Sequence, residues 1–291
     1  MDFRLTDDQQ ALRRGVRALL DRRFDRTALR AAVDAGGVLD RELWRELGAA
    51  GFFALRLPEE AGGVGLGLPE AVLLFEEAGR ALLPGPLVAT HLAAGEVPGA
   101  AEGEVVVTAV DEGGLVEWLD EADVVLGSVE GAVAVRSVDP LTPLHRLPGT
   151  GPADAALRPV AGLLTAAEQV GSAARTTELA VAHARTRAQF GQPIGGFQAV
   201  KHLCAQMLVR TEVARVAVYA AAVTADPVEI AGARLLADEA AVGCARDCLQ
   251  VHGGMGFTWE ADVHLHLKRA WVRAERGGSG AAAEEAVAAA L

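Results

Sequence analysis

Hydrophobic positions recur every three or four residues over most of this chain, which is the spacing of amphipathic helices. The pattern predicts helices that begin near Thr6, Asp40 and Pro69, and a short helix over 87–94. Thr6 and Asp40 are residue types that cap helix N-termini, and proline suits a first helical turn. In the second half of the chain the same spacing predicts long helices joined by short loops, a pattern typical of a helical bundle, over residues 160–187, 197–224, 226–252 and 261–275.

The pattern changes between the two helical regions. Short runs rich in valine are separated there by Gly, Asp and Glu and predict strands at 105–107, 124–126 and 133–135. This region is short enough that a small sheet is the most it can form. The sequence therefore predicts a mainly α fold in three parts: an N-terminal helical domain (1–98), a shortened β domain (99–152) and a C-terminal helical bundle (153–291).

The composition excludes several classes of protein. A net charge of −12 argues against a general nucleic-acid binder, whose surface would be basic. The first residues lack the apolar core of a signal peptide, and no apolar run is long enough to span a membrane, so we expect a cytoplasmic protein. The sparse cysteines Cys204, Cys244 and Cys248 form no disulfide framework. We interpret them as small hydrophobic residues and predict no metal site.

Two segments in the second half carry residues suited to a nucleotide. Arg187 begins the run Arg-Ala-Gln-Phe-Gly-Gln-Pro-Ile, and Gln250 begins the run Gln-Val-His-Gly-Gly-Met-Gly-Phe. An arginine at a helix end binds phosphate with two parallel hydrogen bonds, and a glutamine amide can bind ribose or phosphate oxygens. Gly253 and Gly254 let the backbone approach a ligand closely. Simpler readings stay open: a surface salt bridge for the arginine, a helix stop for the glycines, and core packing for Phe190 and Phe197.

These segments resemble the R-x-Q-F-G-x-P-I-x-x-F-Q and Q-x-x-G-G-x-G-(F/Y)-x-x-E motifs of the acyl-CoA dehydrogenase superfamily. A weaker third match is Gly62-Gly63-Val64-Gly65 after Pro58-Glu59. The resemblance implies an FAD cofactor, an acyl-CoA substrate, an acceptor of the electron-transfer flavoprotein type, and a dimer in which both segments reach a neighbour's FAD. The cofactor-binding residues that it implies are Arg187, Gln189, Phe190, Ile194, Phe197, Gln250, Gly253 and Gly254.

The chain departs from the family where the catalytic base is expected. Arg269-Ala270-Trp271 occupies the family's R-D-A position, and the glutamate expected about nine residues later falls on Gly277 or Gly278. A glycine has no side chain with which to abstract a proton. The alternative position for a base, on the first bundle helix, falls near Ala161, and an arginine that commonly binds the CoA phosphates is replaced near Gly162. The catalytic residue is therefore unknown.

Two further departures bear on function. The middle region is about half the family's usual length and lacks the T-E-x-x-x-G-S-D segment that contacts the flavin ring and the substrate. Substitute bases would have to come from carboxylates that each have a simpler structural interpretation, namely Glu168, Glu260, Asp262 and Glu275. His202 and His252 are interpreted as structural residues.

The leading hypothesis is a subunit of a heterotetrameric acyl-CoA dehydrogenase acting on a bulky, steroid-type or fatty acyl-CoA. This chain would supply the adenine-side FAD contacts, and a homologous chain would supply the base and the ring contacts. Whether the partner is a different chain or a second copy of this one stays open. Two alternatives are a flavin-dependent monooxygenase or tailoring enzyme on the same fold, and a flavin-free scaffold protein.

Overall fold

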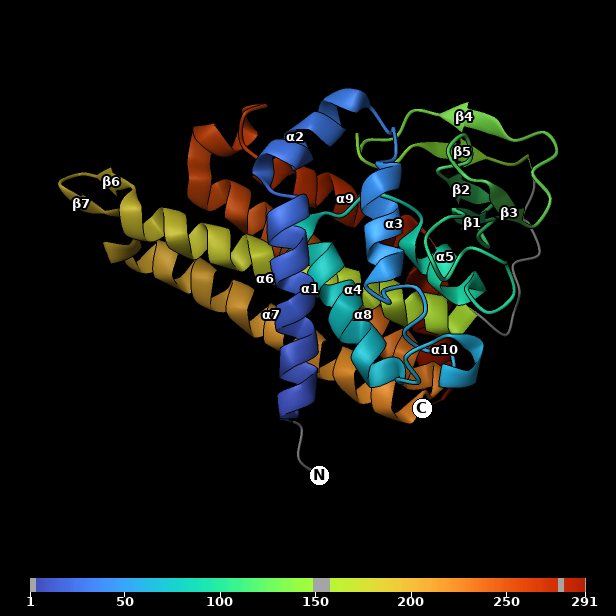
Figure 1. Cartoon of the computed structure of the whole chain (residues 1–291). Coiled ribbons are helices and arrows are strands. Elements are labelled where there is room, and N and C mark those ends of the chain that lie inside the picture. Colours follow the sequence, from blue (N-terminus) through green and yellow to red (C-terminus); the bar gives the residue numbers. More distant parts are fainter. Residues whose placement is uncertain (1–3, 149–157, 277–279, 291) are drawn as a thin grey trace.

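The computed structural model describes residues 4–148, 158–276 and 280–290, and their fold is mainly helical (Figure 1). The first helical region contains α1 (Asp7–Arg23), α2 (Arg26–Ala35), α3 (Arg41–Ala49), η1 (Glu59–Ala61), α4 (Leu68–Ala81) and α5 (Leu87–Ala93). The second contains α6 (Arg158–Thr186), η2 (Ile194–Gly196), α7 (Gln198–Thr224), α8 (Pro227–His252), η3 (Gly253–Phe257), α9 (Val263–Glu275) and α10 (Gly280–Ala289). The mainly α fold expected from the sequence is confirmed.

Local capping explains why several helices begin where the sequence predicts. The Thr6 hydroxyl accepts from the N–H of Gln9, and the Gln9 side chain accepts from the N–H of Thr6, which completes a capping box at the start of α1. Asp40 caps α3 through two backbone N–H groups. The pattern gave no prediction for α2, although Asp25 caps it by accepting from the N–H of Ala28. The capping residue Asp25 was the local signal that could have indicated α2.

The strands between the helical regions are three residues long and form two small sheets. Three of them, β1 (Val107–Ala109), β3 (Val124–Leu126) and β4 (Val133–Val135), match or overlap the predicted strands; β2 (Leu115–Glu117) and β5 (Leu144–Arg146) were not predicted. β1 pairs with β3 in parallel, while β5 lies between β2 and β4 and is antiparallel to both.

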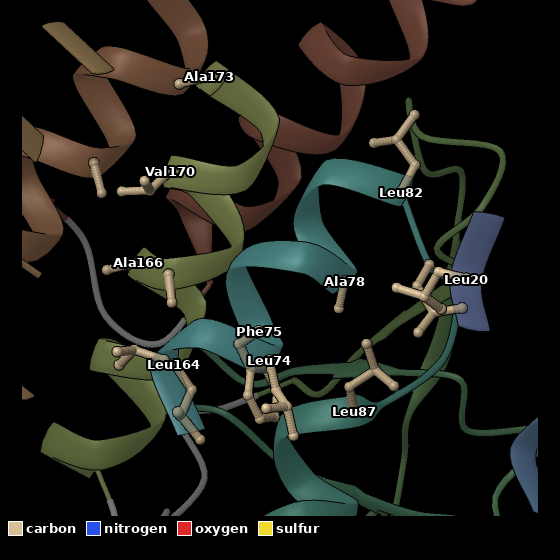
Figure 2. Close-up of a cluster of buried hydrophobic side chains, with 14 of the residues drawn as sticks. Leu20, Leu74, Phe75, Ala78, Leu82, Leu87, Leu164, Ala166, Val170 and Ala173 are labelled. Atoms are coloured by element: carbon tan, nitrogen blue, oxygen red, sulfur yellow. The ribbon is translucent and has the colours of Figure 1, made fainter. Parts of the chain in front are cut away.

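The main core extends from the N-terminal helices to α9, and one part of it lies where α4 packs on α6 (Figure 2). Leu74, Phe75 and Ala78 of α4 and Leu164 of α6 are fully buried in it. Two glycines set the separation of the helices. A Cβ on Gly171 would lie 1.8 Å from the carbonyl oxygen of Glu76, and a Cβ on Gly79 would lie 2.0 Å from the carbonyl oxygen of Glu168. The two backbones are therefore in direct contact, and side chains fill the space on either side of the crossing.

This contact predicts the effect of adding a methyl group. We expect Gly171→Ala to lower the free energy of unfolding by about 1–3 kcal/mol, because the new Cβ meets backbone that must move. The control is Gly15→Ala on α1, where nothing lies within 4 Å of an added Cβ. That change should be neutral or stabilise by up to about 1 kcal/mol through helix propensity. Urea denaturation of both variants checks this, and equal effects would contradict the packing argument.

The long helices separate two regions of the molecule. The hairpin formed by β6 (Ala188–Gln189) and β7 (Gln192–Pro193) lies at one end of α6 and α7, and β1–β5 lie toward the opposite end (Figure 1). α6 has 29 residues, so at about 1.5 Å per residue it spans roughly 43 Å. Among the described residues, no helix combines the length and the apolar character needed to cross a bilayer.

Candidate cofactor site and the C-terminal end of α9

Arg187 lies directly after α6, at the start of the β6–β7 hairpin. Its N–H donates to the carbonyl of His183 at 2.8 Å, and its carbonyl accepts from the N–H of Ile194 at 2.8 Å. The tip of the hairpin has positive φ angles, 52° at Phe190 and 80° at Gly191. The backbone of Arg187 is thus fixed on both sides, while its side chain is exposed. An exposed guanidinium on a fixed backbone suits the binding of a phosphate group.

The other predicted residues of this segment differ in their surroundings. Phe190 is 90% exposed, and its ring meets the half-buried Phe197 edge-on at 6.0 Å between centroids. Ile194 is half-buried and packs against the core, so its position supports the hairpin. The Gln189 amide donates to the carbonyl of Ala188 at 2.8 Å. Phe190 is therefore the apolar residue of this segment that is open to a ligand or a partner.

The second predicted segment forms the turn that ends α8. Gly253 has φ 59° and ψ −142°, and its N–H donates to the carbonyl of Gln250. No atom lies within 4 Å of the position that a Cβ would take on Gly253 or on Gly254. Gly256 is instead buried, and an added Cβ would lie 3.0 Å from the His252 Cβ. The first two glycines therefore present open backbone, and the third serves packing.

A pair of histidines joins the two segments. His183 of α6 and His252 of α8 stack with ring centroids 4.1 Å apart and an interplanar angle of 22°. Burial lowers the pKa of His183, and the nearby His252 and Arg187 lower it further. The structure therefore brings the Arg187 hairpin and the Gly253 turn together through this stack.

In the second half of α9 the arginines are buried and form ion pairs. The Arg269 guanidinium is buried and donates through Nε to the carboxylate of Asp139. It also donates to the carbonyls of Leu83 at 3.1 Å and Leu141 at 3.3 Å. A single arginine therefore ties α9 to the end of α4 and to the loop before β5.

Two more ion pairs lie beside it, one of them buried and the other half-buried. Arg273 donates to Glu168 of α6 at 2.6 Å, and Arg276 donates to Glu117 of β2 at 2.5 Å. Burial raises the pKa of Glu168, with Arg273 acting in the opposite direction. Burial also lowers the pKa of Arg273 to about 10, so its guanidinium stays charged at neutral pH. The cavity that these side chains line measures about 10 Å³, which is about the room that one water molecule needs.

Two family descriptions match this chain. "Acyl-CoA dehydrogenase, N-terminal domain" matches residues 6–101, and "Acyl-CoA dehydrogenase, C-terminal domain" matches residues 160–291. The chain belongs to the acyl-CoA dehydrogenase family. This confirms the resemblance drawn from the sequence motifs, and it places the chain in a family of oxidoreductases.

Individual relatives agree with this membership. Acyl-CoA dehydrogenase IpdE2 of Mycobacterium tuberculosis (strain ATCC 25618 / H37Rv) is 37% identical over 292 residues, which cover 91% of each chain. The ChsE4-ChsE5 complex from Mycobacterium tuberculosis aligns with a TM-score of 0.86 at 24% identity, over 99% of this chain and 98% of that one. A variant of the Tcur3481-Tcur3483 steroid ACAD aligns with a TM-score of 0.85 at 24% identity, over 97% of each chain. The last two likenesses establish the fold alone.

For an acyl-CoA dehydrogenase, the residues around the expected base are of particular interest. Gly277 and Gly278, where the sequence places the lost glutamate, lie outside the described residues. The neighbouring Arg276 is described, and its guanidinium pairs with Glu117. Ala161 and Gly162, at the alternative position, are half-buried in the first turns of α6. The sequence itself shows that none of these positions carries a carboxylate. The consequence for activity stays a prediction.

The four carboxylates weighed as substitute bases have different surroundings. Glu168 lines the small cavity, but its carboxylate is paired with Arg273. Asp262 accepts from Arg26 at 2.5 Å. Glu260 and Glu275 are exposed. Glu275 is the last residue of α9 but is exposed, whereas Glu168 is buried beside α9 and its ion pair favours the structural interpretation.

Sequence reasoning missed the ion-pair cluster on α9. It used Arg269 only to locate the R-D-A position and gave no role to Arg273 or Arg276. A signal was present, because Arg269 and Arg273 lie one turn apart on one face of α9 and Arg276 follows directly after its last residue. Their partners lie far away in the sequence, which is why the pairing itself needs the structure.

Proposed function

We propose that this chain is a subunit of an FAD-dependent acyl-CoA dehydrogenase that holds the adenine half of the cofactor for a homologous, catalytic partner chain. The observation that carries the proposal is the contrast between the two ends of α6. At one end Arg187 and the Gly253 turn are exposed. At the other end, where the family's base is expected, buried ion pairs leave almost no cavity.

The exposed end fits half of a dinucleotide. Arg187 offers a planar, permanently charged donor for the pyrophosphate, and Gln250 is exposed and offers an amide. The backbone at Gly253 and Gly254 is open, so a ligand can approach it without meeting side chains. FAD, when bound, supplies hydride chemistry. In this proposal the residues of this chain bind and orient the phosphates and leave the reacting ring to the partner.

The exposed residues proposed to hold the phosphates lie far from the expected position of the base, so a second polypeptide would complete the site. Arg187 lies at the hairpin end of α6, and the end of α9 lies by β2, toward the opposite end of the molecule (Figure 1). Large apolar side chains are exposed at the tip of the hairpin, Phe190 (90%), and just after the Gly253 turn, Met255 (61%), Phe257 (73%) and Trp259 (50%). Exposed apolar groups gathered around a polar site are typical of a surface that another protein covers.

The outer face of α7 adds to this surface. Val209, Val213, Val216 and Val223 are each at least half exposed. Their spacing alternates between three and four residues when the half-buried Ala220 is included, and this is the spacing of a helix that packs along another helix. We take this face as further support for a partner chain.

The relatives suggest the class of substrate and of assembly. One structural neighbour is a complex of two chains, ChsE4 and ChsE5, and another is described as a steroid ACAD. By analogy we propose a heteromeric enzyme that forms an α,β double bond in a bulky acyl-CoA thioester and passes electrons to an acceptor of the electron-transfer flavoprotein type. The same proposal includes domain boundaries at residues 98 and 152 and a cytoplasmic location.

Co-expression tests this function. The chain is purified alone and together with a longer homologue that carries the family's glutamate, and flavin is quantified by absorbance near 450 nm along with particle size. We expect flavin and dehydrogenase activity only in the mixed complex. A yellow protein that is active when purified alone would favour the monooxygenase or tailoring alternative. Absence of flavin under both conditions would favour a flavin-free scaffold.

A further inference from the structure

The stacked imidazoles lie at the junction of the two nucleotide segments. His183 precedes Arg187 by one helical turn, and His252 is the last residue of α8, directly before Gly253. With ring centroids 4.1 Å apart, the rings are in face-to-face contact. Any group that binds to both the hairpin and the turn therefore binds next to this pair.

Hydrogen bonding determines which nitrogen of His252 can take a proton. Its Nδ1 lies 2.8 Å from the carbonyl oxygen of Cys248. A carbonyl only accepts, so Nδ1 carries the hydrogen and donates it. In the neutral ring the lone pair therefore lies on Nε2, and an added proton goes to that atom.

The charges around the pair influence the pH at which a ring takes up this proton. Arg187 faces His183 from the hairpin and, together with burial and His252, lowers the pKa of His183. His252 borders a cleft of about 590 Å³ whose lining includes Arg175, Glu260 and Asp262, and the Cys248 thiol lies 3.6 Å from its Nδ1. A diphosphate bound at Arg187 would neutralise the positive charge of the guanidinium and place negative charge beside the rings. Negative charge there favours the protonated imidazolium.

We propose that His183 and His252 are part of the diphosphate-binding surface, and that the pair takes up a proton when the diphosphate of FAD binds beside Arg187. The inference rests on the proposed function. The proton comes from solvent and adds to a ring nitrogen, and stacking of one charged ring on one neutral ring keeps the hairpin and the turn together. Two charged rings would repel each other, so the pair is expected to hold about one proton.

The sign of the pH dependence follows from this uptake. Burial, His252 and Arg187 lower the pKa of His183 without ligand, and a bound anion raises it, so binding strengthens as the pH falls between those two values. One proton taken up changes affinity by up to about tenfold per pH unit. We expect affinity for ADP-ribose, which carries the adenine half of FAD and a diphosphate esterified at both ends, to rise about tenfold from pH 8 to pH 6.

Calorimetry of ADP-ribose binding to the flavin-free complex with the catalytic partner tests the inference, because the chain is proposed to hold the cofactor in that complex. In two buffers of different ionisation enthalpy, the wild type should show a buffer-dependent heat that corresponds to proton uptake. The His183→Phe, His252→Phe double variant keeps two stacked rings but cannot titrate, so its heat and affinity should not vary with buffer or with pH from 6 to 8. NMR titration of the two imidazoles should show a pKa that rises when ADP-ribose is added.

The outcomes separate the two proposals. If ADP-ribose binds the complex in an Arg187-dependent manner but without proton uptake or a pKa change, the histidine inference is wrong and the proposed function stands. If ADP-ribose fails to bind the wild-type complex, or binds the Arg187→Ala complex equally well, both are wrong. If the double variant shows the same pH dependence as the wild type, another group is titrating, and the assignment to this pair is overturned.

Discussion

Replacing Asp139 by alanine is expected to lower the free energy of unfolding by about 3–5 kcal/mol, because it leaves the buried Arg269 guanidinium without its counter-ion. Asp139 is 1% exposed and also accepts from the Thr142 hydroxyl at 2.7 Å and from the N–H of Leu141 at 3.0 Å. The substitution therefore removes the carboxylate that joins the loop before β5 to α9. Urea denaturation followed by circular dichroism measures the loss.

The matched control is an ion pair at the surface. Glu42 of α3 pairs with Arg23 of α1 at 3.9 Å, and its side chain is 77% exposed. Exposed pairs of this kind contribute between about 0 and 1 kcal/mol, so Glu42→Ala should change the free energy of unfolding by no more than that. Similar losses for the two variants would show that the cluster on α9 does not have the structural role given to it here.

The second large effect concerns the cofactor. In the complex with the catalytic chain, Arg187→Ala is expected to weaken FAD binding about 10- to 100-fold, because hydrogen bonds to a charged group contribute about 1.5–3 kcal/mol. Arg187→Lys should fall between the wild type and the alanine variant, since an ammonium retains the charge but not the bidentate geometry. Equilibrium dialysis of FAD against the apo-complex measures the change.

Arg185→Ala is the control for this prediction. Arg185 is also exposed and lies two residues earlier, at the end of α6, so its removal alters the local charge by the same amount. FAD affinity should stay within about threefold of the wild type, because one exposed charge at the surface contributes little. If both arginines weaken binding equally, the effect comes from net charge and not from a specific phosphate contact.

Local signals explain what the sequence predicted about the fold. Thr6, Asp40 and Asp226 each cap a helix by bonds to residues at most three positions away, so the information lies within one short segment. β2 and β5 were not predicted, because Leu-Val-Glu and Leu-His-Arg lack the runs of valine that predicted the other three strands. Their pairing joins Leu115 to Arg146, which no local pattern indicates.

The candidate site also combines features that are local in the sequence with contacts between distant residues. The Arg187 hairpin and the Gly253 turn are continuous segments, and the motifs placed them on loops at helix ends, where the structure has them. The stack of His183 on His252 joins two helices, and Arg269 meets Asp139 from 130 residues away, so neither contact was predicted. Assignment of the eight cofactor-binding residues stays a prediction, as does the three-part domain division.

A structure of the FAD-loaded complex between this chain and its catalytic partner tests the central claim most directly. The account predicts density for the FAD phosphates against Arg187 and the Gly253 turn of this chain, with the flavin ring enclosed by the other chain near its glutamate. A flavin ring seated at the end of α9 in this chain, with the Arg273–Glu168 pair displaced, would contradict it.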